Sequence, residues 1–253
     1  MRQDQRAPFV SGLERARQAA YPPGEYVGQE SFLRAGEIRL LAQRAGIGPG
    51  VSVLDVCCGV AGPGRLITAE LGCDYLGLDY SAGALRLARD LAGELPCRFE
   101  QAHVPPVPDV RVDVVLLLET LLAFADKAAL FAEVARVLPP GGRFALTVEE
   151  GRRLTRGERA RMPDADTVWL VEWAELTALL TGAGMAVTWH EECTAAHLAT
   201  ATALLRSFRA DAAAIGDGIG ERALAELLAA HELWTDWLAT GRVRKFMLVA
   251  EKR

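Results

Sequence analysis

The fold is decided by the stretch VSVLDVCCGVAGPG, residues 51–64 of a 253-residue chain. Its first part, 51–56, is an apolar run of the kind that forms a buried strand of a parallel sheet. Small residues then make a tight turn, and a helical run follows as far as Leu71. Small residues let the backbone approach a ligand, and a helix N-terminus offers free N–H groups. Strand, turn and helix therefore predict a nucleotide-like ligand at the carboxyl edge of an open α/β sheet, where we also expect Asp55.

Composition narrows the class of protein around this stretch. Hydrophobic residues make up 51% of the chain, which is enough for a sizeable core. The formal net charge is −5, and the arginine-rich run 152–161 is typical of a solvated loop or helix face. Because phosphate backbones are bound by clustered Lys and Arg, we expect no nucleic-acid partner. No window approaches about 18 apolar residues, and residues 1–12 carry no signal-peptide pattern, so we expect no membrane partner either.

The five cysteines are scattered along the chain. They form no paired C-x-x-C clusters, so the sequence indicates neither a disulfide framework nor a zinc site. His190 and His197 lie near acidic residues, but their spacing matches no metal-ligand motif. We therefore predict free thiols, no metal ion and a cytoplasmic location.

Strands and helices alternate from residue 51 to residue 148, which predicts right-handed βαβ units and a largely parallel sheet. The predicted strands are 51–56, 75–78, 98–101, 112–118, 143–148, 185–190 and 242–250. The predicted helices are 12–20, 31–45, 64–71, 82–95, 127–138, 172–182, 196–215 and 220–239. We expect one domain over 1–253, in which 1–45 is a helical cap and 51–148 the ligand-binding core. Residues 149–170, mobile or partly helical, and 194–240, a helical pair, are expected to form insertions or a lid on the substrate side.

The order of these signals resembles the class I S-adenosylmethionine-dependent methyltransferases. The family's first motif, an acid and a glycine-rich turn after a strand, corresponds to Asp55–Gly62, where Cys57 and Ala61 replace two glycines. The second motif, an acid that ends the second strand, is Asp79, and the proline-glycine-glycine turn before the fifth strand is 140–142. The resemblance implies an α/β, Rossmann-like seven-stranded mostly parallel sheet with helices on both faces. It also implies an N-terminal helical arm and a helical insertion before the last strand.

The resemblance further implies S-adenosylmethionine as the cofactor and S-adenosylhomocysteine as its product. A carboxylate that accepts two hydrogen bonds suits the vicinal hydroxyls of a ribose, which is the role implied for Asp79. Tyr80 would pack on the adenine or the ribose. The backbone of 57–59, with Asp55 behind it, would face the methionine end, although Asp55 could instead only tie the amides of the loop.

The third motif departs from the family pattern. His103 stands where the family often has an acid that meets the adenine amino group. Adenine binding would then rest more on the Ala102 amide and on Gln101, and His103 could instead be a surface turn residue. The cofactor contacts implied are Asp55, Cys57, Cys58, Gly59, Ala61, Asp79, Tyr80, Gln101, Ala102, His103 and Leu118.

Glu119 follows the fourth strand, at the substrate-facing corner of the family's fold. An acid here resembles small-molecule methyltransferases that act on carbon, in which it can remove a proton or stabilise a carbocation. Glu119 is therefore a catalytic and substrate-binding candidate, and His190 is a second candidate base. The substrate-binding candidates besides Glu119 are the aromatic residues Tyr21, Tyr26, Phe124 and Trp169. Trp234 and Trp237 lie one helical turn apart, and we expect them to serve packing.

Two other functions are compatible with this sequence. A nicotinamide dehydrogenase would use Cys57-x-Gly59-x-x-Gly62 as a dinucleotide loop with Asp79 on the ribose, but the first glycine of that motif is missing. A non-methylating enzyme of the cyclase kind, or a binding protein, would keep the fold and the cofactor without the methyl transfer. We predict methyl transfer to O, N or C of a small, partly apolar acceptor, and the sequence leaves open whether the chain is a homodimer.

Overall fold

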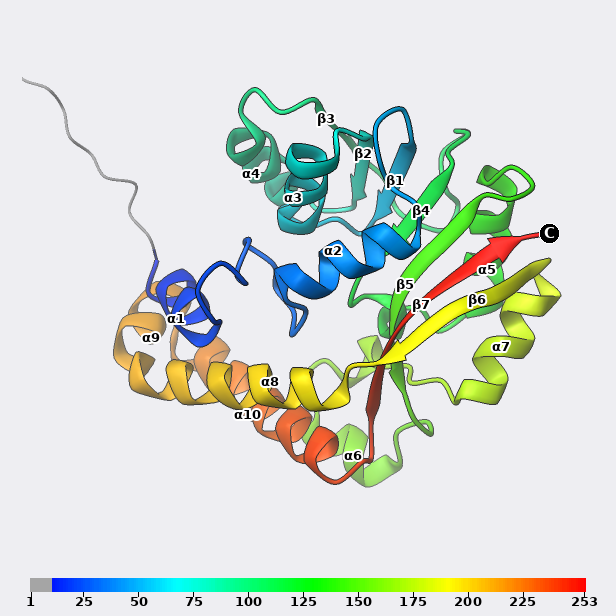
Figure 1. Ribbon diagram of the computed structural model, residues 1–253. Helices are drawn as coiled ribbons and strands as arrows, with labels where there is room; N and C mark the ends of the chain where they lie inside the picture. Colours follow the sequence, from blue (N-terminus) through cyan, green and yellow to red (C-terminus); the bar gives the residue numbers. More distant parts are fainter. Residues whose placement is uncertain (1–10) are drawn as a thin grey trace, which may run out of the picture.

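A seven-stranded sheet runs through the computed structural model, which describes residues 11–253 (Figure 1). The strand order is β3-β2-β1-β4-β5-β7-β6. The strands are β1 (Ser52–Val56), β2 (Asp74–Asp79), β3 (Cys97–Gln101), β4 (Val114–Leu117), β5 (Arg143–Glu150), β6 (Met185–Glu192) and β7 (Arg244–Lys252). Only β7 runs antiparallel to its neighbours among these strands, so the predicted mostly parallel sheet is confirmed. Residues 1–10, which belong to the predicted cap and to the segment searched for a signal peptide, lie outside the described residues.

Helices cover both faces of the sheet, as predicted. They are α1 (Gly12–Ala20), α2 (Ala35–Arg44), α3 (Gly62–Leu71), α4 (Ala82–Ala92), α5 (Lys127–Val137), α6 (Arg156–Arg161), α7 (Trp173–Gly182), α8 (Thr194–Ala210), α9 (Ala212–Ile219) and α10 (Glu221–Ala239). Successive strand residues point to opposite faces. Leu54 and Val115 therefore pack with Phe131 of α5 and Leu176 of α7, whereas Val53 faces a second buried cluster that includes α2, α3 and α4.

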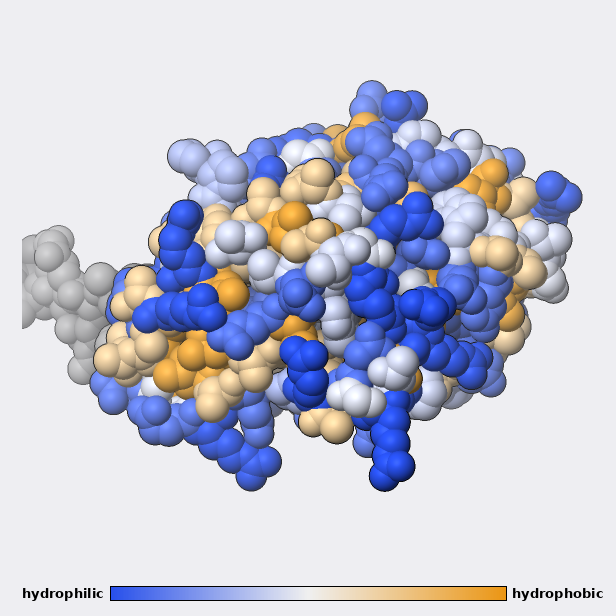
Figure 2. Space-filling view, turned by 90° about the horizontal axis from the view of Figure 1, so that it is seen from below, coloured by the Kyte–Doolittle hydropathy of each residue, from blue (hydrophilic) through white to orange (hydrophobic). Residues whose placement is uncertain are grey.

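A separate helical layer lies below the sheet in Figure 1. It consists of α1, α8, α9 and α10, which share a third buried cluster that includes Ala16, Phe208 and Trp237. Figure 2 shows apolar residues gathered on the surface at this end of the molecule, next to the N-terminal end of the described chain. The expected helical insertion before the last strand is therefore present, and it packs on the N-terminal helix.

Several boundaries differ from the prediction, including the start of α2, the end of α8 and both ends of β7. The helix expected from residue 31 begins at Ala35, because the Gln29 amide binds the carbonyls of Glu25 and Leu33 and holds the chain in a turn before it. The single helix expected over 196–215 is two helices that meet at Asp211, where ψ is 16°. The last strand lies two residues further along the chain than predicted, at Arg244–Lys252.

The insertion after β5 has defined structure. β5 extends to Glu150, and the segment beyond it contains α6 and a 3-10 turn, Ala165–Thr167. The side chain of Arg242 closes the segment against the last strand, since its guanidinium pairs with Glu158 at 2.6 Å. Of the two alternatives for this insertion, mobile or partly helical, the structure shows the partly helical one.

Within residues 11–253, every helix is too short or too polar to cross a lipid bilayer.

Candidate functional site

A cavity of about 580 Å³ opens at the carboxyl edge of the sheet. The loops that follow β1, β2, β3 and β4 all contribute to its lining, through Gly59, Tyr80, His103 and Leu118 among others. The segment before α2 covers one side through Gln29 and its neighbours. Ligand sites of open α/β sheets lie at this edge, so the cavity is where the sequence predicts it.

The loop after β1 is held in left-handed backbone conformations. Cys57, Gly59 and Ala61 have φ values of 63°, 55° and 54°. The Cys58 amide donates to the carbonyl of Leu78 at 2.9 Å, which fastens the loop to the end of β2. Cys57 and Ala61 thus adopt conformations that glycine adopts without strain. Cys57, Cys58 and Gly59 line the cavity; Ala61 does not, and instead begins α3.

Asp79 holds the same loop from the neighbouring strand. One carboxylate oxygen accepts from the Gly59 amide at 2.9 Å, and the other accepts from the Ser81 amide at 2.8 Å. The side chain lines the cavity although Asp79 is only 7% exposed. Asp79 is therefore positioned as predicted, and it has a second task in ordering the loop.

Asp55 is buried behind the loop. Its carboxylate accepts from the hydroxyl of Tyr75 at 2.6 Å, while the loop amide of Gly59 is bound by Asp79. These hydrogen bonds therefore do not support the alternative in which Asp55 binds the loop amides. Burial raises the pKa of Asp55 to about 7. The hydrogen bond from Tyr75 lowers this pKa, whereas the negative charge of Asp79 raises it further. A carboxyl with this pKa responds to a cation placed in the cavity beside it.

Gly64→Ala is expected to destabilise this arrangement. A Cβ at Gly64 would lie 2.2 Å from the Tyr75 ring, so the ring must move and its bond to Asp55 must lengthen or break. We expect a loss of about 1–3 kcal/mol in the free energy of unfolding, measured in urea. Gly157→Ala is the control, because a Cβ there meets no atom within 4 Å. Equal stability of the two variants would contradict this packing argument.

On the side of the first cavity formed by the ends of β2 and β3, the lining residues differ from those predicted. Tyr80 is 65% exposed, and its ring centroid lies 6.0 Å from that of His103; both residues line the cavity. The Ala102 amide donates to the carbonyl of Asp79, and the Gln101 amide donates to the carbonyl of Tyr80. Gln101 does not line the cavity. Gln101 and the Ala102 N–H therefore order the edge of the sheet, and Tyr80 and His103 are the side chains that face the cavity.

A second cavity, of about 240 Å³, adjoins the first. Both cavities are lined by Gln29, Glu30, Ser31 and Glu119, so these residues separate one from the other. The remaining wall of the second cavity combines aromatic side chains with the aliphatic residues Leu122, Leu204 and Ala230 and the charged residues Arg17, Glu149 and Lys245. The aromatic side chains that line it are Tyr21, Phe32, Phe208, His231 and Trp234.

A buried charged cluster forms the floor of the second cavity. The Lys245 ammonium pairs with Glu119 at 2.8 Å and also with Glu149. Burial alone would raise the pKa of Glu119, but the charges of Lys245 and His197 outweigh it and lower that pKa. The two carboxylates likewise raise the pKa of Lys245, against its burial. Glu119 and Lys245 are therefore both charged near neutral pH, and the cluster sets two carboxyl groups against one ammonium.

Glu119 has an oxygen available for a ligand. Its backbone is left-handed, with φ of 58°, and its amide donates to the Thr147 hydroxyl at 2.5 Å. Oε2 binds Lys245, whereas Oε1 is buried and has no hydrogen-bond partner among residues 11–253. An acceptor atom left unpaired at the junction of two cavities is suited to a donor or a positive charge on a ligand.

Three predicted catalytic or substrate-binding residues also lie outside these two cavities. His190 is exposed on β6, and its ring lies 4.9 Å from that of Trp173, so its prediction as a base is not supported by its position. Trp169 lies in a third hollow, with Arg159 over its ring. Tyr26 packs on Tyr21 and donates to Glu14 instead of lining a cavity. Tyr21 lines the second cavity, whereas Phe124, which was predicted to contact the acceptor, lines the first cavity and not the second.

Sequence reasoning missed several residues of the second cavity. Lys245 stands directly before the apolar run of β7, residues 246–250, and a charge inside the predicted strand is the signal that could have revealed it. Glu149 continues β5 in the same way, at a position that is only 4% exposed. Trp234 packs on Trp237, as expected, and it also lines the cavity. His231 carried no signal in the sequence.

Residues 54–146 match the family model of a methyltransferase domain. The chain contains a class I methyltransferase domain. Residues 54–146 include Asp79, Glu119 and the loop that follows β1. This domain therefore supplies most of the first cavity and also Glu119, which lies between the two cavities.

Curated relatives match the same part of the chain. The sterol 24-C-methyltransferase of Schizosaccharomyces pombe is 36% identical over 110 residues, which is 41% of this chain and 29% of the relative. The tocopherol O-methyltransferase of Arabidopsis thaliana is 32% identical over 117 residues, 44% of this chain and 34% of the relative. The methyltransferase domain thus spans about a third of the length of these relatives.

Solved structures resemble the chain over most of its length. The cyclopropane synthase MmaA2 of Mycobacterium tuberculosis superposes with a TM-score of 0.78 at 15% identity, over 95% of this chain and 94% of that one. The cyclase SpnF superposes with a TM-score of 0.73 at 22% identity, over 86% of this chain and 81% of that one. These likenesses establish the fold, which extends beyond the methyltransferase domain to the helical layer.

Proposed function

We propose that the protein transfers a methyl group from S-adenosylmethionine to a small-molecule acceptor. The observation that carries the proposal is the pair of adjoining cavities. One lies over the loop held by Asp79, and the other is an aromatic chamber, with Glu119 between them. Both curated relatives named above are methyltransferases, which supports this reaction class.

The residues of the first cavity fit the cofactor. The bound group would supply an activated methyl on a sulfonium. Asp79 would accept from the ribose hydroxyls, Tyr80 and His103 would flank the adenine, and the backbone of Cys57 and Gly59 would face the methionine end. A Cβ at Gly59 would meet no atom within 4 Å of the described chain, so the loop presents bare backbone to open space there.

The affinity for S-adenosylmethionine is expected to fall at acid pH. The pKa of Asp55 is about 7, and the positive charges of the cofactor favour the ionised carboxylate. Binding therefore releases a proton below that pKa, and affinity should be about tenfold weaker at about pH 6 than at about pH 8. Titration calorimetry at both pH values measures this. Asp55→Asn should bind with little pH dependence, and a wild-type affinity equal at both values would contradict the role of Asp55.

The acceptor would occupy the second cavity. Aromatic walls suit a partly apolar molecule, and the Glu119 carboxylate suits a group that gains positive charge as the methyl arrives. In-line positioning supplies much of the rate of such a transfer, and the junction places the two sites side by side. A second candidate function, a cyclase-like reaction or cofactor binding without methylation, is favoured by the similarity of the fold to the cyclase SpnF.

Glu119→Gln is expected to separate binding from chemistry. The amide can still accept from Lys245, and Lys245 and Glu149 remain as a neutral pair. Cofactor affinity should therefore stay within about threefold, while methyl transfer should fall at least about a hundredfold because the charge at the junction is lost. The measurement is S-adenosylhomocysteine release with an acceptor that the wild type methylates. Unchanged turnover would exclude a catalytic role for Glu119.

The function itself is tested by ligand stabilisation and product release. S-adenosylmethionine should raise the unfolding temperature, whereas NADH should leave it unchanged. S-adenosylhomocysteine should then appear when partly apolar acceptors are screened. Stabilisation by NADH alone would overturn the assignment in favour of a dehydrogenase. If S-adenosylmethionine binds but is not consumed while an acceptor is converted, the cyclase-like alternative is established.

A further inference from the structure

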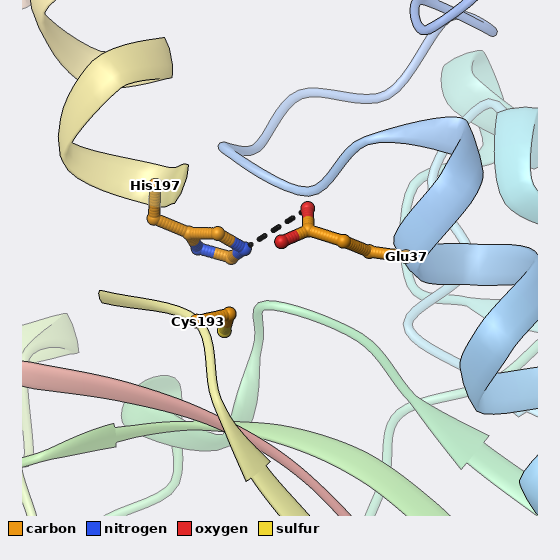
Figure 3. A group of neighbouring side chains, drawn as sticks. All are labelled: Glu37, Cys193 and His197. Carbon is orange, nitrogen blue, oxygen red and sulfur yellow. Dashed lines mark ion pairs between the residues drawn. The ribbon is translucent and has the colours of Figure 1, made fainter. Parts of the chain in front are cut away.

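Three metal-ligating side chains from distant parts of the sequence meet behind the second cavity (Figure 3). Glu37 comes from α2, Cys193 immediately precedes α8, and His197 lies one turn into α8. Their ligand atoms all lie within 4.8 Å of one another, and Nε2 of His197 lies 3.3 Å from Oε2 of Glu37. Figure 3 shows the imidazole and the carboxylate pointing toward each other with the thiol below them.

His197 is completely buried. Its Nε2 faces only the Glu37 carboxylate, at 3.3 Å and without hydrogen-bond geometry, and its Nδ1 has no hydrogen-bond partner in the described part of the chain. A buried polar group without a partner costs about 1–3 kcal/mol, so such a group calls for a ligand. Cys193 is a free thiol, 6% exposed.

The separations suit a tetrahedral metal ion. Zinc binds imidazole nitrogen and carboxylate oxygen at about 2.0–2.2 Å, which at a tetrahedral angle separates the two ligand atoms by about 3.4 Å. The observed separation of 3.3 Å agrees with this value. A tetrahedral ion that binds sulfur at about 2.3 Å holds it about 3.6 Å from the other ligand atoms. Since all the ligand atoms lie within 4.8 Å of one another, a small shift of the thiol suffices. Thiolate, imidazole and carboxylate together favour zinc over magnesium or calcium, which prefer oxygen ligands alone.

We propose that Glu37, Cys193 and His197 bind one zinc ion. The thiol of Cys193 loses its proton to solvent as the sulfur–zinc bond forms, and a water molecule completes the four ligands. No oxidation or reduction takes place.

The ion would join α8, which carries Phe208 of the chamber wall, to α2, which follows the segment that lines the chamber. The Cys193 amide donates to the carbonyl of Lys245 at 2.9 Å, and the Lys245 amide donates to the Thr194 hydroxyl. Zinc therefore braces the strand that carries Lys245 from the side opposite the chamber, and its role is structural.

The decisive experiment measures zinc directly on the full chain. Protein is stripped with a chelator, kept reduced with a phosphine and titrated with zinc in a calorimeter. We expect one zinc per chain with micromolar or tighter affinity. Cys193→Ser and Glu37→Gln should each weaken it at least about tenfold. In Glu37→Gln the amide oxygen can still accept from the Arg34 amide that Glu37 binds at 2.8 Å, so the start of α2 is preserved.

The control is Cys73→Ser, another buried thiol, which contacts Thr68 instead of this cluster. Cobalt added to the wild type should give a thiolate-to-metal absorption that Cys193→Ser abolishes and Cys73→Ser retains. Circular dichroism of the metal-free variants verifies folding, and Glu37→Gln decides the matter if Cys193→Ser does not fold. Absence of tight zinc binding by the wild type, or binding unchanged in both site variants, would overturn the proposal and leave a His197–Glu37 ion pair only. These readouts are independent of methyl transfer.

Discussion

Lys245→Met is expected to destabilise the fold by about 3–5 kcal/mol near pH 7. The substitution removes the only cation that is paired with Glu119 and Glu149 within the described residues. Two buried carboxylates are then left in contact with apolar surroundings, and each has an oxygen that already lacks a hydrogen-bond partner among those residues. Urea unfolding of the purified variant measures the loss.

The loss should shrink as the pH falls. In the wild type, Lys245 lowers the pKa of Glu119 in the folded state, so its contribution is present above the unfolded pKa of about 4.3 and is lost as the pH falls through the lower folded pKa. In the variant, burial without the charge of Lys245 raises the folded pKa of Glu119 above that unfolded value. Protonation of Glu119 therefore restores part of the lost stability as the pH falls from about 7 toward about 4.

The matched control is Lys252→Met on the same strand. The ammonium of Lys252 donates only to the carbonyls of Ala135 and Leu138 at 2.6 Å in the described structure. Its removal exposes no buried carboxylate, so we expect about 1–2 kcal/mol without pH-dependent recovery. Equal losses in the two variants, or a Lys245→Met deficit that is constant with pH, would show that the buried cluster does not have the charges assigned to it.

Asp79→Ala is expected to weaken the binding of S-adenosylmethionine at least about a hundredfold. Its carboxylate accepts from the amides of Gly59 and Ser81 and faces the cavity. Hydrogen bonds to a charged group contribute about 1.5–3 kcal/mol each, and tenfold in affinity corresponds to about 1.4 kcal/mol. Loss of the loop anchor together with the ribose contact therefore exceeds two orders of magnitude. Titration calorimetry on the folded variant gives the affinity.

Asp74→Ala tests whether this effect is specific to the site. Asp74 begins the same strand, β2, at its opposite end, and its carboxylate pairs with Arg98 on the surface at 2.9 Å. An exposed pair of this kind contributes little to stability, so cofactor affinity should be unchanged. Cofactor binding by Asp79→Ala at wild-type strength would place the ribose elsewhere and remove the main support for the first cavity as the cofactor site.

The sequence alone determined the sheet and the cofactor side. Strand and helix periodicity depend on neighbours close in the chain, so the run 51–56, its turn and the acid at Asp79 could be read directly. Helix ends were less accessible, because the start of α2 depends on the bonds of Gln29 and the break at Asp211 falls inside a continuous alanine-rich pattern.

Only the tertiary structure decided which residues form the acceptor chamber and the zinc cluster. Lys245 meets Glu119 across 126 residues, and His197 meets Glu37 across 160. Neither pair follows a local period, and each residue seen singly is typical of a charged surface or of a core histidine. Antiparallel insertion of β7 beside β5 places Lys245 opposite Glu149, and the packing of α8 near α2 brings His197 to Glu37. The chemistry of both places depends on strand order and helix docking, which the local pattern of the chain does not contain.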